Sequence, residues 1–540
     1  MTDGHATSAP RAESFWRRNA VWILVSLVYL SVFPYYERLN NPNENARVWM
    51  TRAIVEHHVL NLDQVEREWG WVNDKATANK HVYSSKAPGA SFLGVPVLWA
   101  QTKLRHLMGW RSPGKKATVF WLRLVAVQLP LCAFLFFFAR YVQGVSRSAA
   151  ARDLLTAGFA LGTIFFPYAV IFVGHSLAAA AGFGAYMLLA PPGATDDSTR
   201  ALAAFRGKGG PVSPAQFFCA GLLAGLCVLF EYQAVLVSAI LAAYAVWRYR
   251  KEAWLFFAGT VPPVIAFGVY HAALFGRPWR LPFGYIENAY FARTAHAAGF
   301  HGLSIPKFSA FGTFLFSADY GLFAFSPLLA LGAACAFVLL ARRPRRDGVA
   351  IIAVCVAMFL FLSGMSNWRA GWCVGPRYVV TVAPFLMVAA AHVWRRGMAR
   401  PLLATLIAGL LIPSVVLNGM SAVMYPHYPE QFNNPVFDLA FPLLGDGYLP
   451  YSVGWLLHLP GRWSLLPIAL LVLAAVSLGV ARLGDGDQRR WLRQLGLCVL
   501  VAVAFLVPLA RYGRKPSAGE AQATALVRGY WEPPPARVGR

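Results

Sequence analysis

The densest group of polar residues in this 540-residue chain follows soon after its first apolar run. Glu44 and Arg47 are three positions apart, and Asp74, Tyr83 and Lys86 come later in the same polar region. If the stretch is helical, Glu44 and Arg47 share one face. A carboxylate beside several cations can accept a proton while the cations hold a phosphate. The alternative is that Glu44 and Arg47 only form a solvated ion pair with each other, since such pairs are common and weak.

A second polar segment, SNWRAGWCVGPRY, covers residues 366–378 and contains Trp368, Trp372, Arg377 and Tyr378. An arginine ahead of a helix can bind a phosphate through two parallel hydrogen bonds, and tryptophan faces stack on sugar rings. This combination would suit a phosphorylated sugar. The alternative is structural, because aromatic residues often anchor helices at the membrane interface and Gly-Pro often forms a turn.

Two more polar residues interrupt apolar stretches. Glu231 lies between Phe230 and Tyr232, at the expected tip of a helical hairpin. An acid at membrane depth indicates a functional site, whereas an acid at the water boundary does not. His175, in the segment PYAVIFVGHS, can bond a substrate hydroxyl or act as an acid or base near neutral pH. The structural alternative is that His175 only forms a hydrogen bond at the end of a helix.

A metal site has little support in the sequence. His57 and His58 are adjacent, so they would point to different faces of a helix. There is no HExxH segment and no cysteine pair with zinc-binding spacing. Six of the seven cysteines lie in apolar runs, and only Cys373 falls in an expected loop. We expect no divalent metal and no disulfide framework.

These side chains must be positioned by membrane helices. The chain is 57% hydrophobic and only 14% charged, whereas a soluble protein has roughly 25% charged residues. This composition excludes disordered, collagen-like and ordinary soluble proteins and predicts an all-α polytopic membrane protein. The net charge of +25 does not indicate nucleic-acid binding, because the basic residues stand mostly at the ends of apolar runs, where they set topology.

We predict thirteen membrane-spanning helices. The first lacks a small-x-small cleavage site, so we expect it to remain in the chain. The apolar runs cover residues 20–35, 118–139, 153–172, 175–190, 215–230, 233–247, 253–274, 322–341, 348–364, 378–394, 401–417, 463–481 and 491–510.

The distribution of Lys and Arg predicts the orientation. If the N-terminal tail (1–19) is cytoplasmic, each short cytoplasmic segment is basic, as the positive-inside rule requires. The membrane domain then covers 20–510, and the basic C-terminal tail (511–540) is outside, against that rule. We expect an integral protein of a bacterial inner membrane with its active site outside.

Four sizeable outer segments follow from this topology, and they cover residues 37–117, 275–321, 365–377 and 418–462. Within the first, residues 88–108 begin with a short apolar run and continue into basic residues. A run of this length with a basic continuation is typical of a helix on the membrane surface. The cytoplasmic loops are short, so chemistry is expected in the outer segments.

The sequence resembles the GT-C superfamily of membrane glycosyltransferases. The similarity is to the glycosyltransferase family 39-like branch of protein O-mannosyltransferases and the aminoarabinose transferase of lipid A. In that branch an acid, usually Asp, follows the first span with Arg three positions later, as Glu44 and Arg47 do here. A Lys-Pro-Pro-type turn opens its surface helix, and Lys86-Ala87-Pro88 matches with one proline replaced. The chain departs from the branch at His175, where a second acid would be expected.

The resemblance implies a GT-C-like fold with thirteen spans, a cytoplasmic N-terminus and an outer active site. It implies transfer of a sugar from a polyprenyl-phosphate donor, with Glu44 as the base. Arg47 and Lys86 would bind the donor phosphate or orient it. Tyr83, Asp74, His175 and Arg377 would bind substrate, and Glu231, Trp368, Trp372 and Tyr378 are further candidates. The branch does not depend on a divalent ion.

Other functions remain open at this point. A transporter or flippase of lipid-linked glycans usually shows internal repeats and ionisable residues at the membrane midplane, which this sequence lacks. A glycan polymerase or ligase would share the lipid-linked donor and differ in its product. A catalytically inactive scaffold is the third alternative, because His175 departs from the pattern. The acceptor is a protein, a lipid or a glycan.

Overall fold

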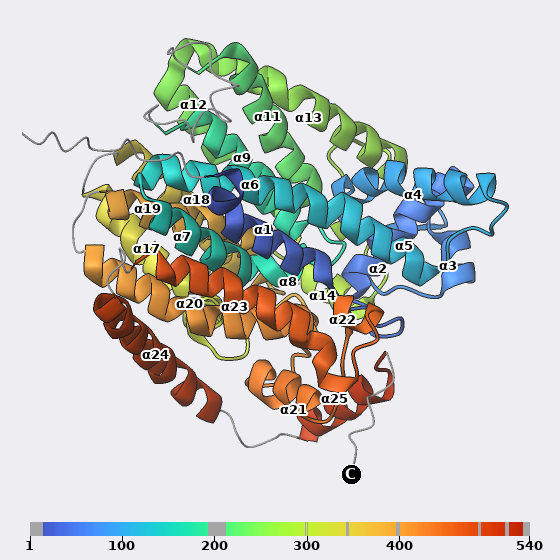
Figure 1. Ribbon diagram of the computed structural model, residues 1–540. Helices are drawn as coiled ribbons and strands as arrows, with labels where there is room; N and C mark the ends of the chain where they lie inside the picture. Colours follow the sequence, from blue (N-terminus) through green and yellow to red (C-terminus); the bar gives the residue numbers. More distant parts are fainter. Residues whose placement is uncertain are drawn as a thin grey trace, which may run out of the picture.

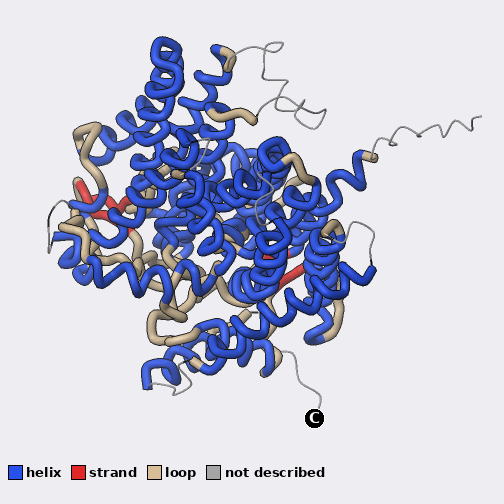
Figure 2. Tube along the Cα trace, turned by 90° about the vertical axis from the view of Figure 1, so that its left-hand side faces the viewer, coloured by secondary structure: helices blue, strands red, loops and turns tan. Residues whose placement is uncertain are grey.

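The protein was analysed as a computed structural model, and it is almost entirely helical (Figures 1 and 2). The structure describes residues 14–192, 212–296, 299, 301–341, 345–395, 400–483, 488–512 and 518–532. Most of the predicted N-terminal tail and the end of the predicted C-terminal tail lie outside these ranges. So do some basic residues used to predict the orientation, such as Arg343 and Arg396.

Each of the thirteen predicted apolar runs falls on helical structure. The helices are α1 (Phe15–Ser31), α5 (Lys115–Trp121) continued by η2 (Leu122–Gln128) and α6 (Leu129–Ser146), α7 (Ala149–Gly162), α8 (Phe165–Ala169), α9 (His175–Leu189), α11 (Pro214–Phe230), α12 (Val235–Tyr249), α13 (Ala253–Phe275), α16 (Leu322–Phe325), α17 (Pro327–Leu340), α18 (Arg345–Gly364), η7 (Arg377–Val382) continued by α19 (Ala383–Arg395), α20 (Arg400–Val423), α23 (Leu466–Ala481) and α24 (Gln488–Arg511).

Within the described chain, seven helical segments are long and apolar enough to cross a membrane. They are Lys115–Ser146, Tyr232–Phe275, Arg345–Gly364, Arg377–Arg395, Leu402–Val423, Gly461–Ala481 and Leu492–Arg511. The expected all-α polytopic membrane protein is confirmed. The count of thirteen spans stays a prediction, because several of the other helices are shorter.

Glycine allows α9, α11 and α13 to pack closely, as small residues do between membrane helices. A Cβ atom on Gly221 of α11 would overlap the carbonyl oxygen of Phe256 in α13, and one on Gly259 of α13 would overlap the carbonyl oxygen of Phe218 in α11. Gly174, just before α9, lies equally close to the carbonyl oxygen of Phe230. This packing places the start of α9 against the end of α11.

The first long loop has its own local structure. Its elements are α2 (Pro42–Arg52), η1 (Ala53–His57), α3 (Asp63–Trp69), the hairpin strands β2 (Lys75–Ala78) and β3 (His81–Ser84), and α4 (Gly89–Leu107). Asn41 caps α2 by accepting a hydrogen bond from the Asn43 N–H at 2.8 Å, with Pro42 in the first turn. The helix predicted over 88–108 is therefore present as α4, and Trp99, Leu104 and Leu107 are exposed on it.

All four predicted outer segments meet at one end of the molecule, which we call the loop end. Ala76 pairs with Ile286, and Leu303 pairs with Met365. The Cys373 N–H donates to the Tyr428 carbonyl at 3.1 Å. The remaining elements of this end are η4 (Tyr232–Ala234), η6 (Pro282–Tyr285), α14 (Ala289–His296), α15 (Phe308–Phe316), η8 (Val436–Ala440), α21 (Phe441–Gly445), α22 (Val453–Leu456), η9 (Gly461–Leu465), and strand β1 (Val32–Phe33) paired with β4 (Tyr451–Ser452).

The C-terminal helix α25 (Ala518–Gly529) also docks on the loop end, beside α21 and α22 in Figure 1. Glu520 accepts a hydrogen bond from the Asn433 N–H at 3.2 Å, and Arg528 pairs with Asp446. After the helix, the ring of Trp531 packs against Tyr36 of the first loop. The first loop and this C-terminal helix therefore lie at the same end of the molecule.

Candidate functional site

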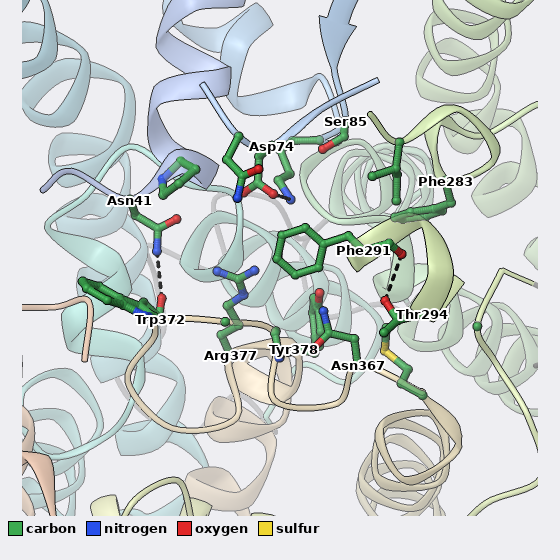
Figure 3. A pocket seen from close by; sticks show the side chains of 18 of the residues that line it. Asn41, Asp74, Ser85, Phe283, Phe291, Thr294, Asn367, Trp372, Arg377 and Tyr378 are labelled. Atoms are coloured by element: carbon green, nitrogen blue, oxygen red, sulfur yellow. Dashed lines mark hydrogen bonds and ion pairs between the residues drawn. The ribbon is translucent and has the colours of Figure 1, made fainter. Parts of the chain in front are cut away.

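A cavity of about 760 Å³ opens at the loop end (Figure 3). Its wall is polar on one side, where the first loop meets the segments around residues 367–378 and 427–430. On the other side it is apolar, where the starts of α12 and α14 meet the end of α18. The apolar residues are Val235, Leu236, Leu281, Phe283, Ile286, Phe291, Leu303, Phe361 and Met365. An amphipathic cavity of this kind suits a ligand with a polar head and an apolar chain.

Five of the residues singled out in the sequence line this cavity, namely Asp74, Lys86, Trp372, Arg377 and Tyr378. Lys86 lies just before α4, and its Nζ pairs with Asp74 Oδ1 at 3.0 Å. Burial lowers the pKa of Lys86, against the effect of Asp74, and the nearby guanidinium of Arg377 lowers it further. The polar side of the cavity is therefore rich in positive charge.

Arg377 is a buried cavity cation that makes no ion pair within the described part of the chain. Its residue is 6% exposed, and it makes no ion pair with any carboxylate in the described part of the chain. Its Nε atom is buried and has no hydrogen-bond partner there. Figure 3 shows the guanidinium pointing into the cavity towards Asp74. A hydrogen bond with Tyr378 and the charge of Asp74 stabilise this buried cation, but no carboxylate of the described residues lies within ion-pair distance of it, so the position is suited to an anion from outside the chain.

Glu44 has different surroundings from those expected. It is fully buried and does not line the cavity. Arg123 binds both of its oxygens, through Nε at 2.7 Å and Nη2 at 2.6 Å, and the Phe172 N–H donates to it at 2.7 Å. Burial raises the pKa of Glu44, but Arg123 and the Phe172 N–H outweigh burial and leave the pKa below its ordinary value.

The surroundings of Glu44 differ from the alternative weighed from the sequence, and its role as base stays a prediction. Glu44 does not pair with Arg47. Its partner is Arg123 of η2, which is distant in the sequence but adjacent in the fold, and Arg47 pairs with Glu231 instead. As described, Glu44 is also not placed to accept a proton from a molecule in the cavity, since both oxygens are occupied by Arg123. The carboxylate of the first loop that does line the cavity is Asp74.

Arg47 forms a second buried pair, behind the cavity wall. Its Nη2 lies 2.7 Å from Glu231 Oε1, at the end of α11. Burial lowers the pKa of Arg47, while Glu231 raises it. Glu231 Oε1 is also 3.4 Å from Nδ1 of His175 at the start of α9. A carboxylate from the end of α11 thus lies beside His175, and neither Glu231 nor His175 lines the cavity.

Two further candidates also lie outside the cavity lining. The ring of Tyr83 packs edge-on against Phe275. The ring of Trp368 packs edge-on against Tyr320, whose hydroxyl donates to the Trp368 carbonyl at 2.7 Å. Both contacts are structural, and Trp372 is the tryptophan of that segment that reaches the cavity.

His427 is a cavity residue that the sequence analysis missed. It is 1% exposed, and its ring makes no hydrogen bond to a side chain in the described residues. Burial lowers its pKa to about 3, with Arg123 and Arg377 acting in the same direction and Glu44 opposing them. The segment YPHYPE around it has no recognisable spacing, so only its place in the fold identifies it.

One group of possible metal ligands occurs among the described residues, namely Glu56, His57 and Glu68. Arg52 already bonds to Glu56 at 2.7 Å and to Glu68 at 2.5 Å, so both carboxylates have a cation. The group lies outside the cavity lining.

Comparisons with known proteins found no matching family model and no matching curated protein. Among solved structures, the chain is similar to the Archaeoglobus fulgidus oligosaccharyltransferase in its apo form, with 14% identity and a TM-score of 0.45 over 80% of this chain. This chain spans 58% of the length of that protein. The same archaeal enzyme, AglB, was also found in complex with an inhibitory peptide and a dolichol-phosphate, at 15% identity.

A third similar structure is ArnT from Cupriavidus metallidurans bound to undecaprenyl phosphate. It shows 13% identity and a TM-score of 0.44, over 92% of this chain and 77% of that chain. AglB and ArnT belong to the GT-C superfamily, which is the superfamily that the sequence resembles.

Proposed function

We propose that this protein is a membrane glycosyltransferase that moves a sugar from a polyprenyl-phosphate donor to an acceptor hydroxyl in the cavity. The observation that carries the proposal is the buried guanidinium of Arg377, which faces the cavity and makes no ion pair with a carboxylate among the described residues. A phosphate would supply an anion through charge-assisted hydrogen bonds. Lys86, at the same wall, supplies a second cation.

The apolar side of the cavity supports a lipid as the carrier of that phosphate. Val235 is half exposed, and with Leu236 and Phe361 it lines the cavity between the ends of α12 and α18. Both helices belong to apolar segments that can cross a membrane. A polyprenyl chain could therefore follow this side from the membrane while its phosphate reaches Arg377.

The residues fit a simple transfer. The acceptor hydroxyl attacks the anomeric carbon, the bond from that carbon to the phosphate oxygen breaks, and polyprenyl phosphate leaves with the bonding electrons. Arg377 and Lys86 stabilise the charge of the leaving phosphate. We assign the proton to Asp74, the carboxylate of the first loop in the cavity wall. Glu44, predicted as the base from the sequence, is assigned to hold Arg123.

We further propose that the loop end faces away from the cytoplasm, as the basic loops predict. A flippase would release the lipid-linked sugar unchanged, and a polymerase or ligase would attach it to a growing glycan. Mass spectrometry of the products of purified protein with polyprenyl-phosphate sugars separates these functions. The acceptor is best found by comparing envelope glycolipids and glycoproteins with and without the gene.

Arg377→Ala tests the observation on which the proposal rests. We expect this variant to bind polyprenyl phosphate about ten- to a hundredfold more weakly, because it loses charge-assisted hydrogen bonds. Folding should be retained, because Arg377 makes no ion pair among the described residues and its removal leaves no carboxylate unpaired. Binding can be measured with a fluorescent polyprenyl phosphate in lipid nanodiscs.

Arg369→Ala is the matched control. Arg369 belongs to the same segment, pairs with Asp319 at 2.5 Å and does not line the cavity. We expect it to bind the lipid phosphate as the wild type does. Equal binding by wild type and Arg377→Ala would remove the basis of the proposed function.

A further inference from the structure

His427 is held rigidly in the cavity wall. The Tyr36 hydroxyl donates to the carbonyl of Met424, three residues before it. The Tyr428 carbonyl, directly after it, accepts from the Cys373 N–H at 3.1 Å. Cys373 belongs to the same segment as Arg377, so one set of backbone contacts fixes both cavity residues relative to each other. Preorganisation of this kind is expected for a side chain that contacts a ligand.

The charged groups around His427 give this part of the cavity wall a net positive charge. Three charged groups act on its ring, namely Glu44, Arg123 and Arg377. Glu44 and Arg123 neutralise each other in a two-bond pair, whereas Arg377 makes no ion pair with a carboxylate among the described residues. Of the cavity carboxylates, Asp74 is bound to Lys86, and Glu430 is exposed to solvent. The described residues around His427 thus offer no buried, free carboxylate for a cation.

A neutral imidazole in such a wall has a defined hydrogen-bonding preference. One ring nitrogen donates and the other accepts, and a hydroxyl group can satisfy either of them. An ammonium group can only donate, and it would add a positive charge close to Arg377. Like charges placed together in a binding site strongly disfavour the wrong ligand.

We infer that His427 is a specificity-determining residue that binds a hydroxyl of the transferred sugar, and that this cavity selects donors whose sugar carries no ammonium group. The inference rests on the proposed function and names its substrate class. Neutral sugars, acidic sugars and N-acetylated amino sugars fit this class, because none of them brings a positive charge to the wall.

Matched donors test the inference on the full-length protein. Polyprenyl phosphates bearing glucose, glucosamine or N-acetylglucosamine differ at one position, and the corresponding arabinose, 4-amino-arabinose and N-acetylated derivatives form a second series. In whichever of these two series the protein transfers the sugar, we expect kcat/KM near neutral pH to be at least about tenfold lower for the free-amine donor than for the N-acetylated donor. The difference should shrink at a pH at which the amine is uncharged.

Variants at position 427 assign this selectivity to the residue. His427→Gln keeps one donor and one acceptor and should retain most of the transfer activity, whereas His427→Leu should lower kcat/KM for hydroxyl donors by about ten- to a hundredfold. Both should still bind sugar-free polyprenyl phosphate, which shows that they are folded. His427→Asp should improve use of the amine donor relative to the N-acetylated donor.

The outcomes are distinguishable. Equal or better use of the amine donor by the wild type would overturn the specificity inference and leave the proposed function standing. Unchanged kinetics in His427→Leu would overturn the role of His427. Absence of transfer from every lipid-phosphate donor would overturn the proposed function and this inference with it.

Discussion

Charged side chains around the cavity are arranged as pairs from distant parts of the chain. Glu44 is paired with Arg123, and Arg47 with Glu231, each at 2.7 Å or less. Removing one member of such a buried pair is expected to be damaging, because the other charge is left without a partner. A loss of activity at these positions must therefore be separated from a loss of folding.

The roles of Asp74 and Glu44 can be separated by isosteric amides. We expect Asp74→Asn to lower transfer by about 10²- to 10⁴-fold, the usual contribution of a general base. Folding and donor binding should persist, because the Asp74–Lys86 pair is only partly buried. Glu44→Gln should instead destabilise the protein by about 3–5 kcal/mol by leaving Arg123 unpaired. Single-turnover transfer and thermal unfolding in detergent measure the two effects.

The opposite pattern would restore the sequence-based assignment. If Glu44→Gln is folded and binds donor but is inactive, and Asp74→Asn is active, then Glu44 is the base and must leave Arg123 during the reaction.

His427 also predicts a pH dependence of stability. Its pKa in the folded protein is about 3, against roughly 6.5 for an unperturbed histidine. Between these values the unfolded chain binds a proton that the folded protein excludes, so stability rises as the pH increases over this range and levels off above it. Glu44, with its lowered pKa, also loses its contribution as the solution becomes acidic.

The comparison with His427→Gln isolates the histidine. We expect the wild type to lose more stability than this variant between pH 7 and pH 4.5, measured by thermal unfolding of the purified protein. Parallel loss in both proteins would mean that His427 is protonated readily in the folded state.

The sequence could identify the types of residue at the site but not their partners. Glu44 and Arg47 were expected on one helical face, and both are indeed on α2. Their partners come from η2 and from the end of α11, and no local spacing can reveal such contacts. Lys86, Asp74 and Arg377 were predictable because they stand in polar loop segments, Lys86 and Arg377 within the recognisable patterns Lys86-Ala87-Pro88 and SNWRAGWCVGPRY. His427 was not, because an isolated histidine between prolines has no distinctive pattern.

At the level of the helices, the packing of α11 against α13 fixes the position of Glu231, which follows the last residue of α11. We expect Gly221→Ala to destabilise the protein strongly, because the added Cβ would overlap the Phe256 carbonyl and the two helices would have to separate. The displaced α11 should also weaken the ion pair between Glu231 and Arg47.

Gly419→Ala in α20 is the matched control, since a Cβ atom there has no neighbour within 4 Å. It should be neutral or slightly stabilising, as alanine favours helix more than glycine does. Thermal unfolding of both variants checks the prediction, and similar stability of the two would mean that α11 and α13 tolerate a wider spacing.

Helix positions could be predicted more completely than helix lengths. The apolar runs located the helices correctly because membrane helices need long apolar segments. The run over 153–172 is interrupted, however, and forms α7 and α8 with a break near Thr163. Apolar composition alone cannot show such a break, since buried irregular backbone can be as apolar as a helix.

For the molecule as a whole, the proposed orientation can be tested by cysteine labelling. Lys80 and Asp446 are exposed at the loop end, whereas Lys251 is exposed at the connection between α12 and α13. We expect a membrane-impermeant maleimide to label Lys80→Cys and Asp446→Cys in intact cells, and Lys251→Cys only after permeabilisation. Background labelling should be small, because six of the seven native cysteines are buried.

The reverse labelling pattern would invert the orientation and place the cavity on the cytoplasmic side. In that case the donor would be taken from the inner leaflet. Arg343, which the sequence places on the same side as Lys251, lies outside the described residues, so Lys251 is the better position to probe.

The docking of the C-terminal helix has a consequence for biosynthesis. Leu526 of α25 lines the cavity, and the Glu37 N–H donates to the Glu532 carboxylate, 495 positions later in the chain. At about 5–20 residues per second, the ribosome needs roughly 25–100 s to travel from one to the other. Throughout that time the wall of the cavity is unfinished, and it stays unfinished after Asp74 and Arg377 have been synthesised. The cavity wall is completed only once α25 has been synthesised, which makes this helix the last described element that the proposed lipid-phosphate site requires.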